Sequence, residues 1–222
     1  KADVSYSFKT FGTLGISMNS LSMGTFEGYN IVNNNPVSTG DYTGKGLSTG
    51  ISYGIGFYQN MYIGVTFKYI SETIDDVVAN GTTVDVGFLL KNIFKEKFAI
   101  GFNAQNIGQP IKYKDISSKM PLNFKFGFSA MLNEMFIFAL DGNIPIDNKF
   151  KINSGFEFGP QDLIVIRMGY SYRFGDLEYS TWIAGFSFGL GFNLSKNYYL
   201  DYAFMPYGNL GNTHRIGISL RL

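Results

Sequence analysis

The chain has 222 residues, of which 45% are hydrophobic, 17% are aromatic and only 16% are charged, whereas a typical soluble domain has about a quarter charged residues. The net charge of +1 excludes nucleic acid as a partner, because there is no basic excess to neutralise phosphates. The absence of cysteine excludes disulfides, thiol catalysis and cysteine-based metal sites.

Apolar side chains alternate with small or polar side chains along most of the chain, and this period of two is typical of β-strands. The clearest example runs from Trp182 to Leu194, and a strand of this length, tilted by about 40°, would cross the hydrocarbon core of a bilayer. The alternation predicts thirteen strands, at residues 4–9, 14–19, 47–57, 61–69, 84–91, 98–105, 122–129, 136–141, 150–158, 164–173, 182–194, 198–204 and 215–222.

The predicted connections alternate in length. Tight turns follow the first, third, fifth, seventh, ninth and eleventh strands, and mostly longer polar loops lie between, at residues 24–45, 71–81, 106–121, 143–149, 175–180 and 206–213. Short turns at one end and long loops at the other are the signature of up-and-down outer-membrane barrels. The sequence therefore predicts an all-β fold, a single antiparallel transmembrane β-barrel over residues 1–222, located in the bacterial outer membrane and surrounded by its lipid.

The odd strand count carries a further expectation. Single-chain bacterial barrels close with an even number of strands, so we expect one more strand before Lys1 and fourteen in the complete protein. The alternative is that one predicted strand is merged or split. No apolar run reaches the length of a membrane-spanning helix, and Lys1 opens directly into a strand-like segment without a signal peptide.

The inward face of the predicted barrel is mainly Gly, Ser and Asn, with scattered charges. These charges could select a solute in the lumen, or they could form ion pairs that stiffen the wall or be hydrated by lumen water; the second interpretation is favoured because a charge removed from bulk water needs a partner. The inward charged residues are Lys68, Asp85, Lys91, Lys125, Asp141, Lys151, Glu157, Arg167, Arg173, Asp201, Arg215 and Arg221.

Nothing in the sequence indicates an enzyme, a metal site or a cofactor. His214 is the only histidine and has no identifiable nucleophile partner, and the pair Asp75 and Asp76 lies in a predicted loop. The glycines of residues 50–56 and 185–191 form two smooth inward strips, which could accommodate a plug or simply permit the barrel to bend.

The segment Asp201–Arg215, DYAFMPYGNLGNTHR, resembles the C-terminal signature of the PorV/PorQ-like outer-membrane family, and the runs Val84–Gly87, Gln105–Gly108 and Arg167–Tyr170 resemble it more weakly. That family is related to FadL-type barrels and is expected to have fourteen strands. Its members usually carry an N-terminal Asn-Pro-Ala motif, which this chain lacks. The resemblance implies a non-enzymatic role in type IX secretion, in which the barrel binds other secretion-complex proteins or secreted cargo.

Two functions are therefore expected from the sequence. The first is a secretion-associated barrel that binds the translocon or its cargo through external loops. The second is a FadL-like channel for hydrophobic small molecules, which the charged interior makes less attractive. Candidate partner-binding residues in the predicted loops are Tyr29, Asn34, Tyr42, Tyr113, Lys114, Tyr207 and Asn209.

Overall fold

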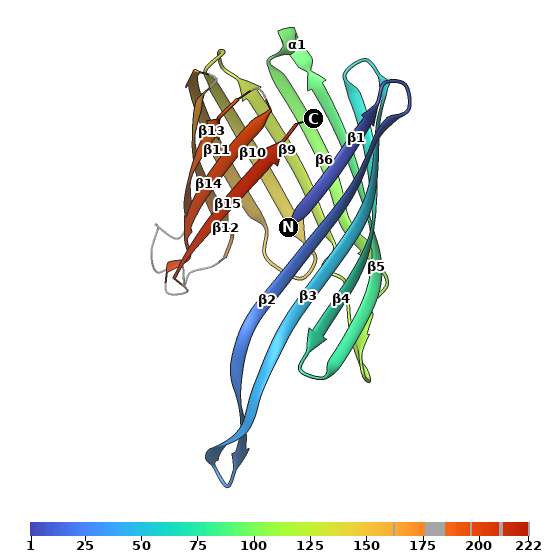
Figure 1. Cartoon of the computed structure of the whole chain (residues 1–222), viewed down its shortest axis with the longest axis vertical. Coiled ribbons are helices and arrows are strands. Elements are labelled where there is room, and N and C mark those ends of the chain that lie inside the picture. Colours follow the sequence, from blue (N-terminus) through green and yellow to red (C-terminus); the bar gives the residue numbers. More distant parts are fainter. Residues whose placement is uncertain (162, 176–184, 196, 209–210, 222) are drawn as a thin grey trace. The chain divides into compact units, whose positions relative to one another are not determined.

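The computed structural model describes residues 1–161, 163–175, 185–195, 197–208 and 211–221. Over these residues, thirteen strands are hydrogen-bonded in one sheet in the order β1-β2-β3-β4-β5-β6-β9-β10-β11-β12-β13-β14-β15, and β7 and β8 form a separate hairpin (Figure 1). The strands are β1 (Ala2–Phe8), β2 (Gly12–Val32), β3 (Asn35–Tyr58), β4 (Met61–Ile74), β5 (Val77–Asn92), β6 (Phe98–Gly108), β7 (Ile111–Tyr113), β8 (Ile116–Ser118), β9 (Asn123–Met131), β10 (Phe136–Pro145), β11 (Lys151–Gln161), β12 (Ile164–Arg173), β13 (Phe186–Asn193), β14 (Tyr198–Pro206) and β15 (Asn212–Leu220). The thirteen strands predicted from the alternation are confirmed.

The chain divides into two compact units. Unit 1 comprises Lys1–Phe88 and Asn103–Leu122, and unit 2 comprises Leu89–Phe102 and Asn123–Leu222. The element α1 (Ile93–Glu96) is a single turn in which Phe94 and Lys95 have positive φ. Among the described residues, no helix has the length and apolar character needed to cross a membrane.

In unit 1, two predicted loops are wrong. Residues 24–45 continue β2 and β3 as a hairpin, with pairs running from Thr13 with Gly54 to Val32 with Asn35. Asn33 and Asn34 both have positive φ, and this left-handed conformation makes the tight turn that joins two antiparallel strands. Beyond the last pair of β3 with β4, the paired segment from Thr25 to Thr43 extends as a two-stranded ribbon, visible as the blue hairpin of Figure 1.

The predicted loop at residues 71–81 is likewise mostly strand. β4 continues to Ile74 and β5 begins at Val77, so the connection is a tight turn at Asp75, which has positive φ. The longer β4 and β5 carry Glu72, Ala79 and Gly81 on the same face as Lys68 and Asp85, because side chains two residues apart in a strand share a face.

In unit 2, β9 to β15 pair antiparallel in sequence order. The strand predicted at residues 150–158 is longer in the structure: β11 continues to Gln161, after a register shift between Phe158 and Gln161. The long strand predicted at residues 182–194 is β13 over Phe186–Asn193, and Trp182, Ile183 and Ala184 lie outside the described residues.

The aromatic and aliphatic face of the strands is exposed, as the alternation predicts. In unit 1, Ile16 is 66% exposed and Ile51 62%, and in unit 2, Met168 is 48% exposed. The hydrophobic residues that are buried within the described part of the chain are few and mostly small, namely Ala79, Ala104, Ile111, Met120 and Ala130. A soluble sheet would cover such a face, whereas lipid solvates it.

Candidate functional site

The polar face of the sheet carries a charged cluster in each unit. In unit 1, Lys68 of β4 and Asp85 of β5 form an ion pair, with Lys68 Nζ 2.7 Å from Asp85 Oδ1 and side chains only 18% and 14% exposed. Lys68 Nζ also donates to Asn106 Oδ1 at 2.5 Å, and the backbone N–H of Asn106 donates to Asp85 Oδ1 at 2.8 Å. Each buried charge is therefore compensated by the other and by Asn106.

Asn106, near the end of β6, also ties the end of that strand to Pro121, where the next connection ends. Its positive φ of 60° turns the chain, and its Nδ2 donates to the carbonyl oxygen of Pro121 at 3.0 Å. The two ends of the segment Asn106–Pro121 are thus tied together next to the Lys68–Asp85 pair. The ion pair and the segment base form one polar anchor.

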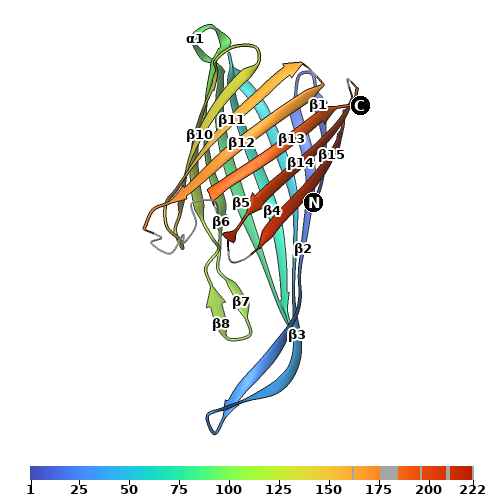
Figure 2. The same cartoon turned by 90° about the vertical axis from the view of Figure 1, so that its left-hand side faces the viewer.

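The segment Asn106–Pro121, predicted as an external loop, instead contains the β7–β8 hairpin and lies on the polar face of β4 and β5. Ile111 and Met120, 6% and 5% exposed, pack on Ala79, with Ile70 and Tyr113 beside them. A Cβ on Gly81 would overlap Ile111 Cγ2 and Met120 Cε, so the missing side chain of Gly81 makes the hollow that they fill. We call this site, lined by Ile70, Ala79 and Gly81, the Gly81 hollow; Figure 2 shows the hairpin that covers it.

Tyr113 fastens the hairpin through a polar contact. Its hydroxyl donates to Glu72 of β4. Burial, and then the hydrogen bond and charge of Glu72, raise the pKa of Tyr113 to about 12. The phenol therefore stays protonated across the physiological range and remains a donor to the carboxylate.

In unit 2, Arg167 of β12 bridges two carboxylates on other strands. Arg167 Nε lies 2.7 Å from Glu157 Oε2 of β11, and Arg167 Nη1 lies 2.7 Å from Asp201 Oδ1 of β14. The side chain reaches β14 across the glycines of β13, because a Cβ on Gly191 would lie 3.1 Å from Arg167 Nη1 and 3.0 Å from Asp201 Oδ1.

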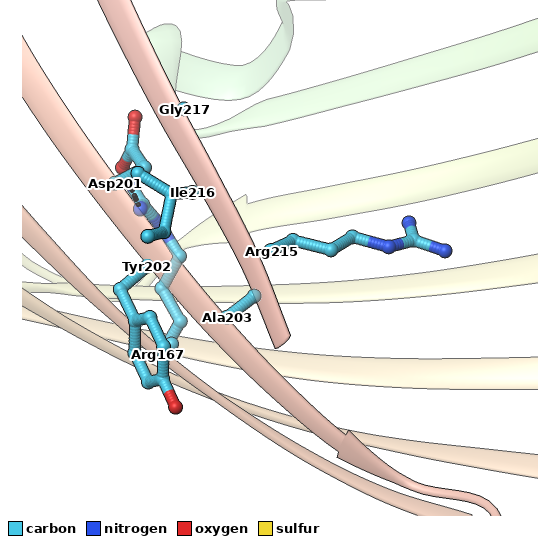
Figure 3. A pocket seen from close by; sticks show the side chains of 8 residues that line it. Arg167, Asp201, Tyr202, Ala203, Arg215, Ile216 and Gly217 are labelled. Atoms are coloured by element: carbon cyan, nitrogen blue, oxygen red, sulfur yellow. Dashed lines mark hydrogen bonds and ion pairs between the residues drawn. The ribbon is translucent and has the colours of Figure 1, made fainter. Parts of the chain in front are cut away.

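A depression of about 400 Å³ lies at this cluster, lined in part by Arg167, Asp201 and Arg215 (Figure 3). The Arg215 side chain extends away from Asp201 in this view, so the carboxylate is engaged by Arg167 and not by Arg215. The predicted ion pairs thus include Lys68 with Asp85, and Arg167 with Glu157 and Asp201.

Other predicted inward residues are placed on the same face of the sheet. Lys125 lies opposite Asn143, and the carboxylate of Asp141 lies over Gly127, where a Cβ would be 2.6 Å from its Oδ1. Arg173 is half-buried and lies opposite Lys151.

The predicted partner-binding residues lie in three places. Tyr29, Asn34 and Tyr42 are exposed on the ribbon, with Asn34 in its turn. Lys114 is exposed at the turn of the β7–β8 hairpin with a positive φ. Tyr207 is exposed after β14, and Asn209 lies outside the described residues.

His214, which the sequence leaves without a catalytic partner, lies beside an aromatic pair. Its Nδ1 is 2.8 Å from the Tyr202 hydroxyl, and its ring contacts Phe204 with centroids 5.2 Å apart. Within the described ranges, no three His, Cys, Asp or Glu side chains come close enough to hold a metal ion.

The sequence prediction missed the residues that build the Gly81 hollow and its cover. Glu72 and Ala79 were placed in a loop because the alternation of apolar and polar side chains stops after Tyr69 and resumes at Val84, whereas β4 runs to Ile74 and β5 begins at Val77. Ile111 and Met120 carry no local signal, since their contacts with Ala79 join segments about 30 to 40 residues apart.

Comparisons with known proteins support the fold. No protein-family model matches this chain, and no curated protein matches it in sequence. Among solved structures, the toluene transporter TodX of Pseudomonas putida is similar with a TM-score of 0.69 at 11% identity, covering 91% of this chain and 75% of that one. The toluene transporter TbuX of Ralstonia pickettii is similar with a TM-score of 0.67 at 11% identity, covering 91% of this chain and 74% of that one.

These structures are transporters by description and not enzymes. The likeness, together with the exposed apolar face, shows an antiparallel transmembrane β-barrel fold, in agreement with the predicted outer-membrane location. The PorV/PorQ-like resemblance is not confirmed by these comparisons.

Proposed function

We propose that this protein is an outer-membrane barrel that passes small apolar molecules, the second of the two functions expected from the sequence. The observation that carries the proposal is an apolar cluster on the face of the sheet that also carries the ion pairs: Ile111 and Met120 are buried on Ala79 in the Gly81 hollow. The fold shared with two toluene transporters points to the same class of solute.

The charges of the two described clusters do not oppose this function, because each of them has an ion-pair partner, although Arg167 between two carboxylates leaves the second cluster with one net negative charge. Lys68 is neutralised by Asp85, and Arg167 is held between Glu157 and Asp201. An apolar solute that passes such pairs does not have to strip water from an isolated charge, which is the costly step.

Uptake of toluene into liposomes tests the proposal. Proteoliposomes with the purified barrel are expected to take up radiolabelled toluene faster than protein-free liposomes, when a reaction inside the vesicles traps the toluene that enters. In a second assay, they are expected not to swell in an isosmotic sugar solution. Uptake equal to that of protein-free liposomes would exclude the transport of toluene-like solutes. Rapid swelling would instead indicate a general hydrophilic pore.

The secretion function stays a second candidate because of the ribbon Thr25–Thr43. The ribbon exposes large side chains, among them Tyr29 at 56% and Ile31 at 79%, and the rings of Phe26 and Tyr42 stack with centroids 5.5 Å apart. An exposed aromatic surface of this kind is common in protein interfaces. Pull-down from native membranes with the intact barrel, but not with a barrel whose ribbon is shortened to a tight turn, would support this function; recovery of the intact barrel alone would count against it.

A further inference from the structure

The β7–β8 hairpin is too small to be a stable element by itself. Each strand has three residues, with three register pairs from Ile111 with Ser118 to Tyr113 with Ile116. An isolated two-stranded hairpin is marginal in water even when longer. Its position therefore depends on what it contacts, namely the Gly81 hollow and Glu72.

The attachments of the hairpin differ in kind between its base and its body. At the base, Asn106 is fixed by Asp85, Lys68 and the Pro121 carbonyl. Beyond the base, the described contacts with the sheet are the apolar packing of Ile111 and Met120 and the Tyr113 contact with Glu72. A segment that is fixed at its base and held elsewhere by two buried apolar side chains and one hydrogen bond can move away as a unit when something else fills the space of those side chains and the Tyr113 hydroxyl releases Glu72.

The hollow itself has the chemistry of a small apolar binding site. Its wall is Ile70 and Ala79, and its floor is the backbone of Gly81, which presents no side chain. Ala79 is 1% exposed beneath the hairpin, so the hollow is fully covered while Ile111 and Met120 occupy it. On the outer side of the hairpin, Ile116 is 73% exposed, so the apolar contact is confined to the inner side.

We propose that the Gly81 hollow is a subsite for a small apolar solute and that the β7–β8 hairpin is its displaceable cover, with Ile111 and Met120 occupying the place of the solute. The ligand is a compact hydrocarbon, such as an unsubstituted aromatic ring or a short branched alkyl group. This inference rests on the proposed function, since it names a step at which the passing solute is bound. The solute and the two side chains compete for one space, so holding the hairpin down abolishes binding in the hollow.

A reversible disulfide can hold the hairpin down. A Cβ placed on Gly81 lies 3.8 Å from the Cβ of Ile111, within the range of about 3.5–4.5 Å that disulfides span. In the Gly81→Cys, Ile111→Cys double variant the second change removes the Ile111 Cγ2 that would overlap the new Cβ, and the end of the flexible Met120 side chain, 2.5 Å from that Cβ, has to shift. The natural chain has no cysteine, so no other disulfide can form within it.

A matched control locks the sheet without touching the hairpin. A Cβ on Gly15 of β2 lies 3.6 Å from the Cβ of Ser5 of β1, so Ser5→Cys with Gly15→Cys makes a disulfide of the same kind within unit 1. Both double variants are reconstituted in liposomes and measured oxidised and after reduction. The measurements are uptake of toluene and the fluorescence of bound N-phenyl-1-naphthylamine, an apolar probe.

With the hairpin locked, uptake and probe binding are expected to fall to the level of protein-free liposomes. On reduction they are expected to rise above that level but not to reach the value of the natural protein, because the new side chain at position 81 still fills part of the hollow. The control variant is expected to be unaffected by oxidation. Equal uptake and probe binding by the locked and reduced forms would overturn the inference. If the natural protein takes up no toluene, the proposed function fails on its own, and probe binding then decides: loss on locking supports the subsite, and unchanged binding rejects it.

Discussion

Replacing Asp85 with leucine is expected to lower the free energy of unfolding by about 2–4 kcal/mol, because it leaves a mostly buried ammonium without its counter-charge. The Lys68 and Asp85 side chains are only 18% and 14% exposed, so water cannot compensate the loss fully. The backbone N–H of Asn106 loses its acceptor at the same time. Equilibrium urea unfolding in phospholipid vesicles, followed by circular dichroism, gives the value.

The double variant Lys68→Met with Asp85→Leu is the control for this prediction. It removes both charges, so its stability is expected to lie closer to that of the natural protein than that of the Asp85→Leu variant. If the single and double variants unfold at the same urea concentration, the ion pair does not contribute as the structure indicates. Protease cleavage between Asn106 and Pro121 should also increase in the single variant, since Asn106 anchors that segment.

Replacing Gly12 with alanine is expected to destabilise the barrel through two separate effects. Gly12 has a φ of +87°, which costs an L-residue about 1–2 kcal/mol. A Cβ there would also overlap the carbonyl oxygen of Gly54 on β3, and forcing such a backbone apart adds about 1–3 kcal/mol. The sum should appear as a lower urea midpoint in the same unfolding experiment.

Gly24 separates the two effects. Its φ is +76°, but a Cβ there has no atom within 4 Å, so Gly24→Ala should show only the conformational cost. The difference between the two variants then measures the approach of the β1–β2 turn to β3. Equal losses in the two variants would mean that Gly12 and Gly54 are not in contact.

Much of the fold could be predicted because alternation is a local property of a strand. It identified thirteen strands and the face that lipid covers, since successive side chains in a strand point to opposite faces and the residues next to a position therefore indicate its face. It failed in the ribbon, because the large apolar residues change from even to odd positions between Phe26 and Tyr29, where the pairing shifts register next to Gly28, so no single period of two runs through it. The Asn33–Asn34 pair was nevertheless a visible turn signal, because asparagine tolerates the left-handed conformation that such a turn needs.

The site could be predicted only in part, because its contacts cross long stretches of chain. The type of interaction was expected, and Lys68 with Asp85 and Arg167 with Glu157 and Asp201 are ion pairs. The partner of each charge depends on strand register, and Arg167 finds Asp201 only because β13 presents glycine between them. The docking of Ile111 and Met120 on Ala79 depends on where a whole segment folds back, which no local pattern encodes.

The ribbon also fixes where the bilayer must end. From Pro36 to Tyr42, β3 pairs with β2 on one edge, and no strand among the described residues pairs with its other edge. The peptide groups along that edge would each cost several kcal/mol in hydrocarbon. The hydrocarbon core of the bilayer therefore ends no farther along β3 than Gly44, and the aromatic rings of Phe26, Tyr29 and Tyr42 lie outside it, at the level of the lipid headgroups and beyond.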